Sequence, residues 1–329
     1  MSEIQTRVEP TPALTSATET GAAKADAAKS DRPRSLGSDA WRELRRRPLF
    51  IASLALILLF VVMAAFPSLF TSVDPTYAEL TRNLEPPKWE NWFKTGVDGQ
   101  FGYDIQGRDV YARTIYGARA SIIVGLTSVL GTTIVGGIIG IIAGYFGGWI
   151  DSLLSRFADI FLGIPFVLGS LLILSTFASR AREQPSSVKI ASLVIVTLIA
   201  LGWPVFARIM RASVIATKQL DYVAAARALG AGPLRIIFRH ILPNAVAPVI
   251  VVATVSIGAY IGAEATLSFL GVGLQDPVIS WGVMISRGIE YRDVAPHMML
   301  FPGTFLTIAV LSFVMLGDAV RDALDPKLR

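Results

Sequence analysis

Six apolar stretches, each about as long as a membrane-crossing helix, constrain this chain more than any other feature. They lie near residues 48–68, 121–143, 157–178, 190–210, 244–264 and 300–317. About 20 apolar residues in a helix cross the roughly 30 Å of hydrocarbon in a bilayer. The chain is 53% hydrophobic and only 17% charged, whereas soluble domains carry about 25% charged residues. The sequence therefore predicts an all-α, polytopic membrane protein with six transmembrane helices.

Basic residues are concentrated in two places. The stretch "WRELRRRP" (41–48) stands directly before the first span, and residues 208–243 carry six basic residues against one acidic residue, Asp221. Lys and Arg mark the cytoplasmic loops of membrane proteins, so we interpret the net charge of +5 in this way and expect no nucleic-acid partner. Both termini are expected in the cytoplasm, and residues 71–120 on the other side of the membrane.

These expectations divide the chain into five segments. Residues 1–38 are rich in Ala, Thr, Ser, Glu and Pro without apolar periodicity, which predicts a disordered cytoplasmic tail. The other segments are a cytoplasmic anchor with the first transmembrane helix (39–70), an extracytoplasmic loop (71–120), a membrane core with transmembrane helices two to six and a cytoplasmic loop over 211–243 (121–317), and a cytoplasmic C-terminal tail (318–329).

Several chemistries are excluded by missing residues and motifs. There is no Cys, and the two histidines, His240 and His297, lie far apart in sequence, so we expect no metal site. No G-x-x-x-x-G-K-[ST], H-E-x-x-H or G-x-S-x-G pattern occurs, which argues against an ATP site, a metalloprotease or an esterase. The chain is predicted to be no enzyme, with no catalytic residue and no cofactor of its own.

Three glycines in the second span, Gly136, Gly140 and Gly144, recur every four residues and share one helix face. Small residues at this spacing allow close helix packing in a bilayer, within the chain or against a second subunit. No ionisable residue stands in the middle of a span. Because ion-coupled carriers commonly place such residues there, this counts against an ion-driven carrier.

The stretch "DYVAAARALGAGPLRIIFRHILPN" (221–244) predicts two short helices between spans four and five. A helix over 218–229 would end at Gly230, which suits a C-terminal cap, and Pro233 would open the second helix. That second helix should present two faces, one with Leu234, Ile237, Phe238 and Ile241 and one with Arg235 and Arg239. One alternative is an interfacial helix lying on membrane lipid.

This stretch closely resembles the EAA signature of permease subunits in binding-protein-dependent ABC importers. That signature is Glu-Ala-Ala, three residues, Gly, nine residues and Ile-x-Leu-Pro. Ala225 and Ala226 match its alanines, Gly230 its glycine, and "LP" at 242–243 its end. Ala224 replaces the glutamate and His240 the isoleucine, so the chain lacks the carboxylate of the signature.

Four further stretches resemble the dipeptide/oligopeptide permease group, on the subunit type with an extended N-terminal region. They are "WRELRRRPLFIASLALILL", "FGYDIQGRDVYARTIYGARASIIVG", with Tyr103 in place of threonine, "ATLSFLGVGLQDPVISWG" and "GDAVRDALDPKLR". Together they cover about residues 39–329. The resemblance implies a type I ABC importer permease fold with a cytoplasmic coupling helix, in the inner membrane of a prokaryote.

The resemblance also implies partners and site residues. The partners are a second homologous permease subunit, an extracytoplasmic substrate-binding protein that delivers peptide, and two ATP-binding subunits, which would hold ATP and Mg. The residues expected to couple to the ATPase subunits are Asp221, Ala224, Ala225, Ala226, Arg227, Gly230, Leu234, Ile237 and Arg239. Residues that bind substrate are not predicted.

Three alternatives remain open from the sequence. The chain could be an ion-coupled or facilitative carrier that acts alone, or a membrane-anchored scaffold that transports nothing. It could also belong to an importer of a non-peptide substrate, such as haem or a nickel chelate, since relatives of the peptide permeases handle these.

Overall fold

The computed structural model describes residues 44–45, 47–91, 97–180 and 186–324. Within these ranges the regular secondary structure is helical, with one isolated bridge between Tyr103 and Asp109 and no strand. The expected all-α class is confirmed for this part of the chain. The predicted tail over 1–38 lies outside the described residues, as do the last five residues of the predicted C-terminal tail.

Five helices are long and apolar enough to cross a membrane. They are α3 (Pro48–Ala65), α4 (Val110–Phe146), α7 (Ser187–Lys218), α11 (Ala247–Phe269) and α13 (His297–Leu324). The bent pair α5 (Gly148–Leu162) and α6 (Phe166–Arg180) passes the same test jointly. The described residues therefore contain six spans if this pair counts as one crossing, which agrees with the predicted number.

The third span does not have the predicted geometry. The sequence predicted one helix over 157–178, whereas α5 and α6 meet at an angle of 84°. The N–H of Gly163 closes α5 by donating to the carbonyl of Asp159 at 3.0 Å. Ile164 precedes Pro165, and a residue before proline is disfavoured in the α-helical region. These two effects break the helix inside an otherwise apolar run.

Two other helices are longer than their apolar cores. The second span was predicted over 121–143, but α4 begins at Val110 and takes in residues assigned to the loop. The side chain of Asp109 starts this helix by accepting a hydrogen bond from the N–H of Ala112 at 2.6 Å, as an N-cap residue does. The fourth span was predicted to end at 210, but α7 continues to Lys218. Hydropathy locates the membrane-embedded part of a helix and not its ends.

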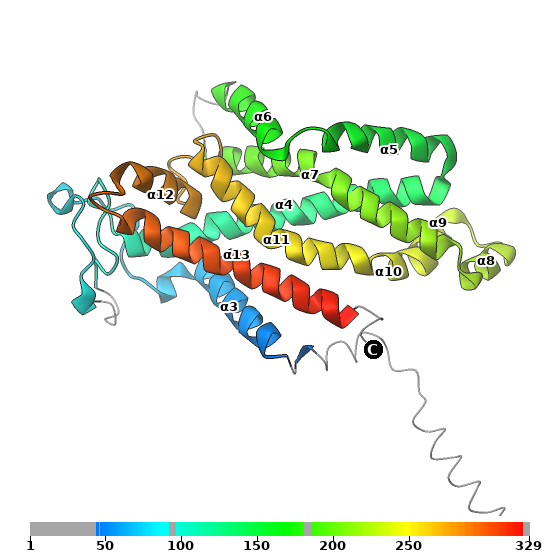
Figure 1. The fold of residues 1–329 in the computed structure, drawn as a ribbon, viewed down its shortest axis with the longest axis horizontal. Helices are drawn as coiled ribbons and strands as arrows, with labels where there is room; N and C mark the ends of the chain where they lie inside the picture. The colour runs from blue at the N-terminus through cyan, green and yellow to red at the C-terminus, as the bar shows by residue number, and fades with distance from the viewer. Residues whose placement is uncertain (1–43, 46, 92–96, 181–185, 325–329) are drawn as a thin grey trace, which may run out of the picture. The chain divides into compact units, whose positions relative to one another are not determined.

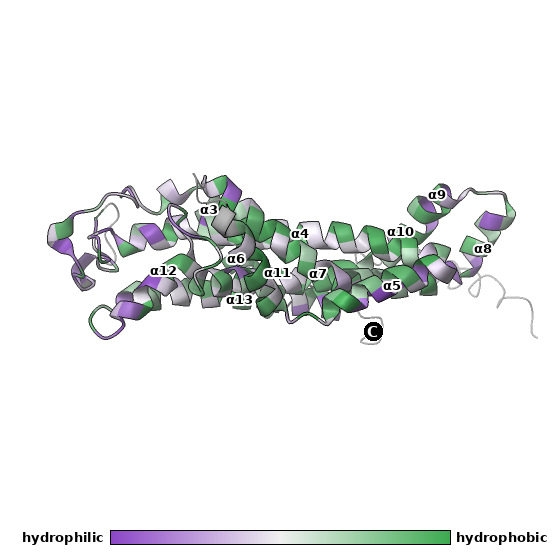
Figure 2. Ribbon diagram, turned by 90° about the horizontal axis from the view of Figure 1, so that it is seen from above, coloured by the Kyte–Doolittle hydropathy of each residue, from purple (hydrophilic) through white to green (hydrophobic). Residues whose placement is uncertain are grey.

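The spans pack side by side along the length of the bundle. α4 lies along α7, α11 packs on α13 and α4, and α3 packs on α13 and α4 (Figure 1). Residues 71–91 and 97–109 gather with α12 (Trp281–Gly288) at one end, which we call the loop end. α8 (Asp221–Ala228) and α9 (Pro233–Ile236) form the other end, the α8 end. Hydrophobic residues cover the middle of the bundle, and hydrophilic residues gather at both ends (Figure 2).

Candidate functional site

The segment 219–246 joins α7 to α11 at the α8 end. α7 ends at Lys218, whose Nζ donates to the carbonyl oxygens of Gly144 at 2.9 Å and Tyr145 at 3.0 Å, at the last turn of α4. Because Lys218 remains in α7, the helix predicted over 218–229 begins only at Asp221. The segment therefore leaves the bundle from a point that is fixed to both long helices.

Gly230 ends α8 in the predicted manner. Its φ of +82° lies in the left-handed region, which residues with a Cβ adopt less readily than glycine. The N–H of Gly230 donates to the carbonyl of Arg227 at 3.0 Å, and that of Ala231 to the carbonyl of Ala226 at 3.1 Å, which is the hydrogen-bond pattern of a Schellman cap. A Cβ at Gly230 would meet nothing within 4 Å, so its backbone conformation and not its size demands glycine.

The second half of the segment begins at Pro233, as predicted, but then departs from a regular helix. α9 continues into a π-helical turn, Ile237–Ile241, and then α10 (Leu242–Ala245). A π turn bonds residues five apart. The predicted apolar face is split into a buried pair and an exposed pair. Ile237 and Ile241 are buried, whereas Leu234 is 71% and Phe238 64% exposed.

Two of the nine expected coupling residues face the chain itself. Val223 and Ala226 are the buried residues of α8, and Ile237 is buried beside Ile236. An α-helix that packs on its own chain buries one face, so Ala226 and Ile237 offer little surface to a partner, and their contact with one stays a prediction. The other seven are exposed, namely Asp221, Ala224, Ala225, Arg227, Gly230, Leu234 and Arg239.

Bulky apolar side chains and cations remain uncovered on the same segment. We define the coupling face as Leu229, Leu234 and Phe238 together with Arg227, Arg235 and Arg239, all of which are exposed. The three arginines form no ion pair with any residue that the structure describes. Leu229 is 89% exposed, and the sequence analysis did not include it among the coupling residues. Its place directly before the capping Gly230 could have indicated that its side chain is exposed.

A polar contact fixes the orientation of α8. Asn244 Nδ2 donates to the Tyr222 hydroxyl and to the carbonyl of His240, both at 2.9 Å. The Tyr222 hydroxyl in turn donates to the His240 carbonyl at 3.3 Å. These bonds tie α8 to α10, which leads directly into α11. The coupling face is thus held in a set orientation toward a membrane span.

The glycines at 136, 140 and 144 face α7 of the same chain. A Cβ at Gly136 would stand 2.5 Å from the carbonyl oxygen of Trp203, and one at Gly144 would stand 2.9 Å from that of Arg211. A Cβ at Gly140 would collide with the carbonyl of Ala207 in the same way. α4 and α7 therefore approach at three successive turns where no side chain larger than hydrogen fits.

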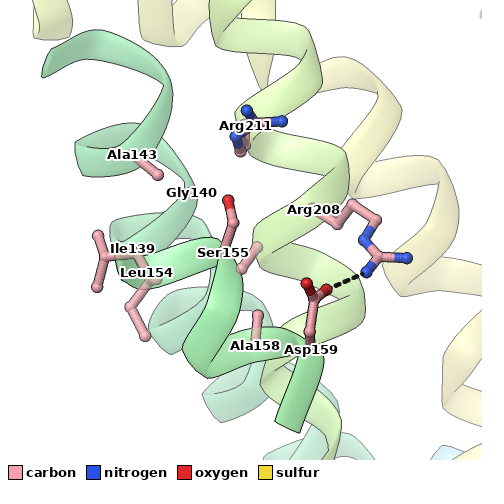
Figure 3. Close-up of a pocket in the computed structure, with 10 residues that line it drawn as sticks. Ile139, Gly140, Ala143, Leu154, Ser155, Ala158, Asp159, Arg208 and Arg211 are labelled. Atoms are coloured by element: carbon pink, nitrogen blue, oxygen red, sulfur yellow. Dashed lines mark hydrogen bonds and ion pairs between the residues drawn. The ribbon is translucent and has the colours of Figure 1, made fainter. Parts of the chain in front are cut away.

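A pocket of about 270 Å³ lies between α4, α5 and α7, beside this glycine contact (Figure 3). Two ion pairs hold α5 to α7 at its rim. Arg211 binds both carboxylate oxygens of Asp151, and Arg208 binds Asp159 at 2.8 Å. Small residues of all three helices, Gly140, Ala143, Ala158 and Ala207, are among those that line the pocket.

A second pocket, of about 490 Å³, lies at the bend between α5 and α6. Four aromatic rings line it, namely Phe161, Phe166, Phe206 and Tyr260. Its chemistry suits apolar groups and not ions. No group of three or more His, Cys, Asp or Glu within the described residues could hold a metal ion.

The loop end buries charge that is already paired. Asp104 binds Arg108 through Nε and Nη2, both at 2.7 Å, and Arg113 Nε lies 3.7 Å from the same carboxylate. Asp109 also accepts the N–H of Gly99 at 2.6 Å. Burial raises the pKa of Asp109, against the lowering effect of the N–H groups of Ala112 and Gly99.

Residues 136–329 match the family described as "Binding-protein-dependent transport system inner membrane component". The chain belongs to this family. Residues 35–87 of this permease also match the "N-terminal TM domain of oligopeptide transport permease C". The resemblance inferred from the EAA-like stretch is therefore confirmed.

Named relatives of this permease are similar over most of their length. It is 38% identical to the dipeptide transport system permease protein DppC of Alkalihalophilus pseudofirmus, over 88% of this chain and 90% of that protein. It is 36% identical to the oligopeptide transport system permease protein OppC of Bacillus subtilis, over 90% of this chain and 91% of that protein. It is 34% identical to the glutathione transport system permease protein GsiD of Pectobacterium atrosepticum, over 88% and 90%.

A solved structure shares the fold of this permease. A chain of the MetNI methionine ABC transporter, in an inward-facing conformation, superposes with a TM-score of 0.50 at 21% identity. The match covers 64% of this chain and 96% of that one. It supports the type I importer fold that the sequence predicted.

Proposed function

We propose that this permease is a transmembrane subunit of an ATP-driven importer of dipeptides or oligopeptides. With a second, homologous permease subunit it would line the translocation path. The observation that carries the proposal is the similarity, over nearly nine tenths of the chain, to permeases named for dipeptides and oligopeptides. The relative named for glutathione supports the same substrate class, because glutathione is itself a small peptide.

The coupling face is proposed to dock on an ATP-binding subunit. Leu229, Leu234 and Phe238 offer apolar side chains for a hydrophobic groove. The arginines at the same end, which pair with no described acidic residue, can meet acidic groups at its rim. No phosphate-binding G-x-x-x-x-G-K-[ST] loop occurs in this sequence, so two partner subunits would bind ATP and Mg and perform the hydrolysis. If the segment instead lay on the lipid surface, Leu229 and Phe238 would insert among the headgroups. That alternative explains their exposure but assigns them no role in transport.

The proposed orientation places the α8 end in the cytoplasm, together with both termini. The excess of arginine on residues 208–243 supports it. The loop end would then face outward in the inner membrane of a prokaryote, where an extracytoplasmic binding protein delivers the peptide. The absence of cysteine makes this orientation testable with single-cysteine variants at positions 98 and 228.

Reconstituted uptake tests the function. Proteoliposomes with the complete complex should accumulate a radiolabelled dipeptide only when ATP and the binding protein are present, and liposomes with this chain alone should not. Uptake by the chain alone, driven by an ion gradient, would favour the carrier alternative. Competition by haem or a nickel chelate, but not by peptides, would reassign the substrate.

A further inference from the structure

A buried carboxyl group on α11 has no role in the function proposed above. Glu264 has no solvent exposure and forms no ion pair with any described residue. Its Oε1 accepts hydrogen bonds from the hydroxyls of Ser268 at 2.7 Å and Ser280 at 3.2 Å, and the Ser121 hydroxyl lies beside the same carboxyl group. Burying a carboxyl group costs free energy unless it is hydrogen-bonded. The groups that bond to Glu264 therefore indicate its role.

Each of the three serines also accepts a hydrogen bond from a backbone N–H. Leu274 donates to Ser268 Oγ at 2.9 Å, Trp281 to Ser121 Oγ at 3.3 Å, and Val283 to Ser280 Oγ at 3.3 Å. All three donors lie between the end of α11 and the first turn of α12, which contains Trp281 and Val283. A hydroxyl that gives its own proton to a carboxyl oxygen keeps its lone pairs free for such a donor.

The same segment is packed as tightly as it is bonded. The Trp281 side chain is fully buried, and its Nε1 donates to the carbonyl of Thr114 on α4 at 2.9 Å. A Cβ at Gly282 would stand 2.7 Å from the Cα of Ala265 on α11. The first turn of α12 therefore touches both α4 and α11 directly.

We infer that Glu264 is a positioning residue for transport. Its carboxyl group orients the serine hydroxyls that hold residues 271–283, and with them α12, on α4 and α11. Because α11 starts next to the coupling segment and ends at this cluster, a displacement of α11 carries α12 with it. This consequence for transport rests on the proposed function, whereas the polar link itself does not.

Single-cysteine labelling tests the link on a chain that has no native Cys. Leu274→Cys places a thiol at a buried position of the segment. The complete complex in lipid nanodiscs exposes both membrane faces to a polar maleimide, so the assay needs no assumption about orientation. The measured quantity is the labelling rate at position 274 in each background.

Glu264→Leu should raise this rate at least about tenfold, a factor that corresponds to about 1.4 kcal/mol, because two hydroxyls lose their acceptor. Glu264→Gln keeps a carbonyl oxygen for both hydroxyls, and its rate should stay within about threefold of the parent. Thr266→Val is the matched control on the same helix, since that hydroxyl donates to the carbonyl of Gly262. The control should label like the parent.

An unchanged rate in Glu264→Leu, or an equally fast rate in Glu264→Gln, overturns the inference. If Glu264→Leu fails to assemble, Ser268→Ala removes one bond only and should give an intermediate rate, and no change there also overturns it. Peptide uptake is measured on the same samples and should fall in Glu264→Leu while the ATP-binding subunits still co-purify. A parent complex that transports no peptide yet shows the labelling pattern would refute the proposed function and leave the link standing.

Discussion

The two ends of the bundle treat their charged residues in opposite ways. At the loop end, Asp104, Arg108 and Arg113 are buried together and paired. At the α8 end, Arg227, Arg235 and Arg239 are exposed, without an ion pair to any described residue. The charges at the loop end are paired within the chain, whereas the arginines at the α8 end are available to pair with acidic groups of a partner.

Large apolar residues are exposed at both ends. At the loop end Trp281 and Tyr103 are buried but Tyr77 and Leu80 are exposed, and at the α8 end Leu229, Leu234 and Phe238 are exposed beside the three arginines. Exposed bulky residues beside unpaired arginines are typical of interaction surfaces. The contrast indicates that substitutions at the loop end should lower the stability of the chain, and that those on the coupling face should lower its affinity for a partner.

The largest effect is expected from Asp104→Ala at the loop end. It leaves Arg108 and Arg113 buried without their carboxylate, and breaking a buried ion pair costs about 3–5 kcal/mol. Thermal unfolding of the purified complex, followed by tryptophan fluorescence, should show a clearly lower midpoint. The control is Arg292→Ala, which removes an exposed pair with Asp293 at 3.8 Å and should change little. Equal midpoints for the two variants would contradict the contrast between the ends.

Neighbouring alanines on α8 separate affinity from stability. Ala225→Trp adds bulk on the exposed face and should weaken association with the ATP-binding subunits by about 1–3 kcal/mol, the usual cost of overpacking a contact, without lowering the unfolding midpoint. Ala226→Trp adds the same bulk on the buried face and should lower the unfolding midpoint, which Ala225→Trp should not. Co-purification and thermal unfolding measure the two effects. If Ala225→Trp retains its ATP-binding partners and normal uptake, the exposed side of α8 is not the docking surface for those subunits.

Gly230 and Gly232 differ in backbone conformation, and substituting each tests whether that conformation matters. Gly230→Val forces a branched residue to a φ of +82° and should cost about 1–2 kcal/mol, seen as weaker ATPase association and lost substrate-stimulated hydrolysis. Gly232 has φ −71° and ψ 162°, which valine adopts readily, and a Cβ there meets nothing within 4 Å. Gly232→Val should therefore behave like the parent.

The smallest effect is expected at the α5–α7 contact. Arg208 and Asp159 are 64% and 49% exposed, and exposed pairs contribute only about 0.2–1 kcal/mol. Arg208→Gln should therefore lower the unfolding midpoint slightly at low salt and not at high salt, where such pairs are screened. A large, salt-independent loss would mean that this pair is protected from solvent in the assembled complex.

Much of this architecture could be predicted from residue patterns. The apolar blocks indicate the spans, and Gly230 and Pro233 mark the end of α8 and the start of α9, because caps and proline positions depend on local backbone chemistry. The break at Gly163–Pro165 was not predicted, since a bent apolar run has the same hydropathy as a straight one.

Other features depend on contacts that sequence spacing does not reveal. The spacing does not reveal the π turn at Ile237–Ile241, nor that Ile237 and Ile241 are buried while Leu234 and Phe238 are exposed. The bond from Trp281 to Ser121 joins residues 160 positions apart, so the surroundings of Glu264 become visible only in the fold.

The length of α4 has a mechanical consequence. At 1.5 Å per residue its 37 residues form a rod of about 55 Å, well beyond the roughly 30 Å of a bilayer core, and its sequence contains no proline. Asp109 caps its N-terminus, and near its C-terminus the carbonyls of Gly144 and Tyr145 accept hydrogen bonds from Lys218 of α7. We expect such a rod to tilt or slide as one lever, so that a push delivered at Lys218 reaches the opposite side of the membrane without an intervening joint.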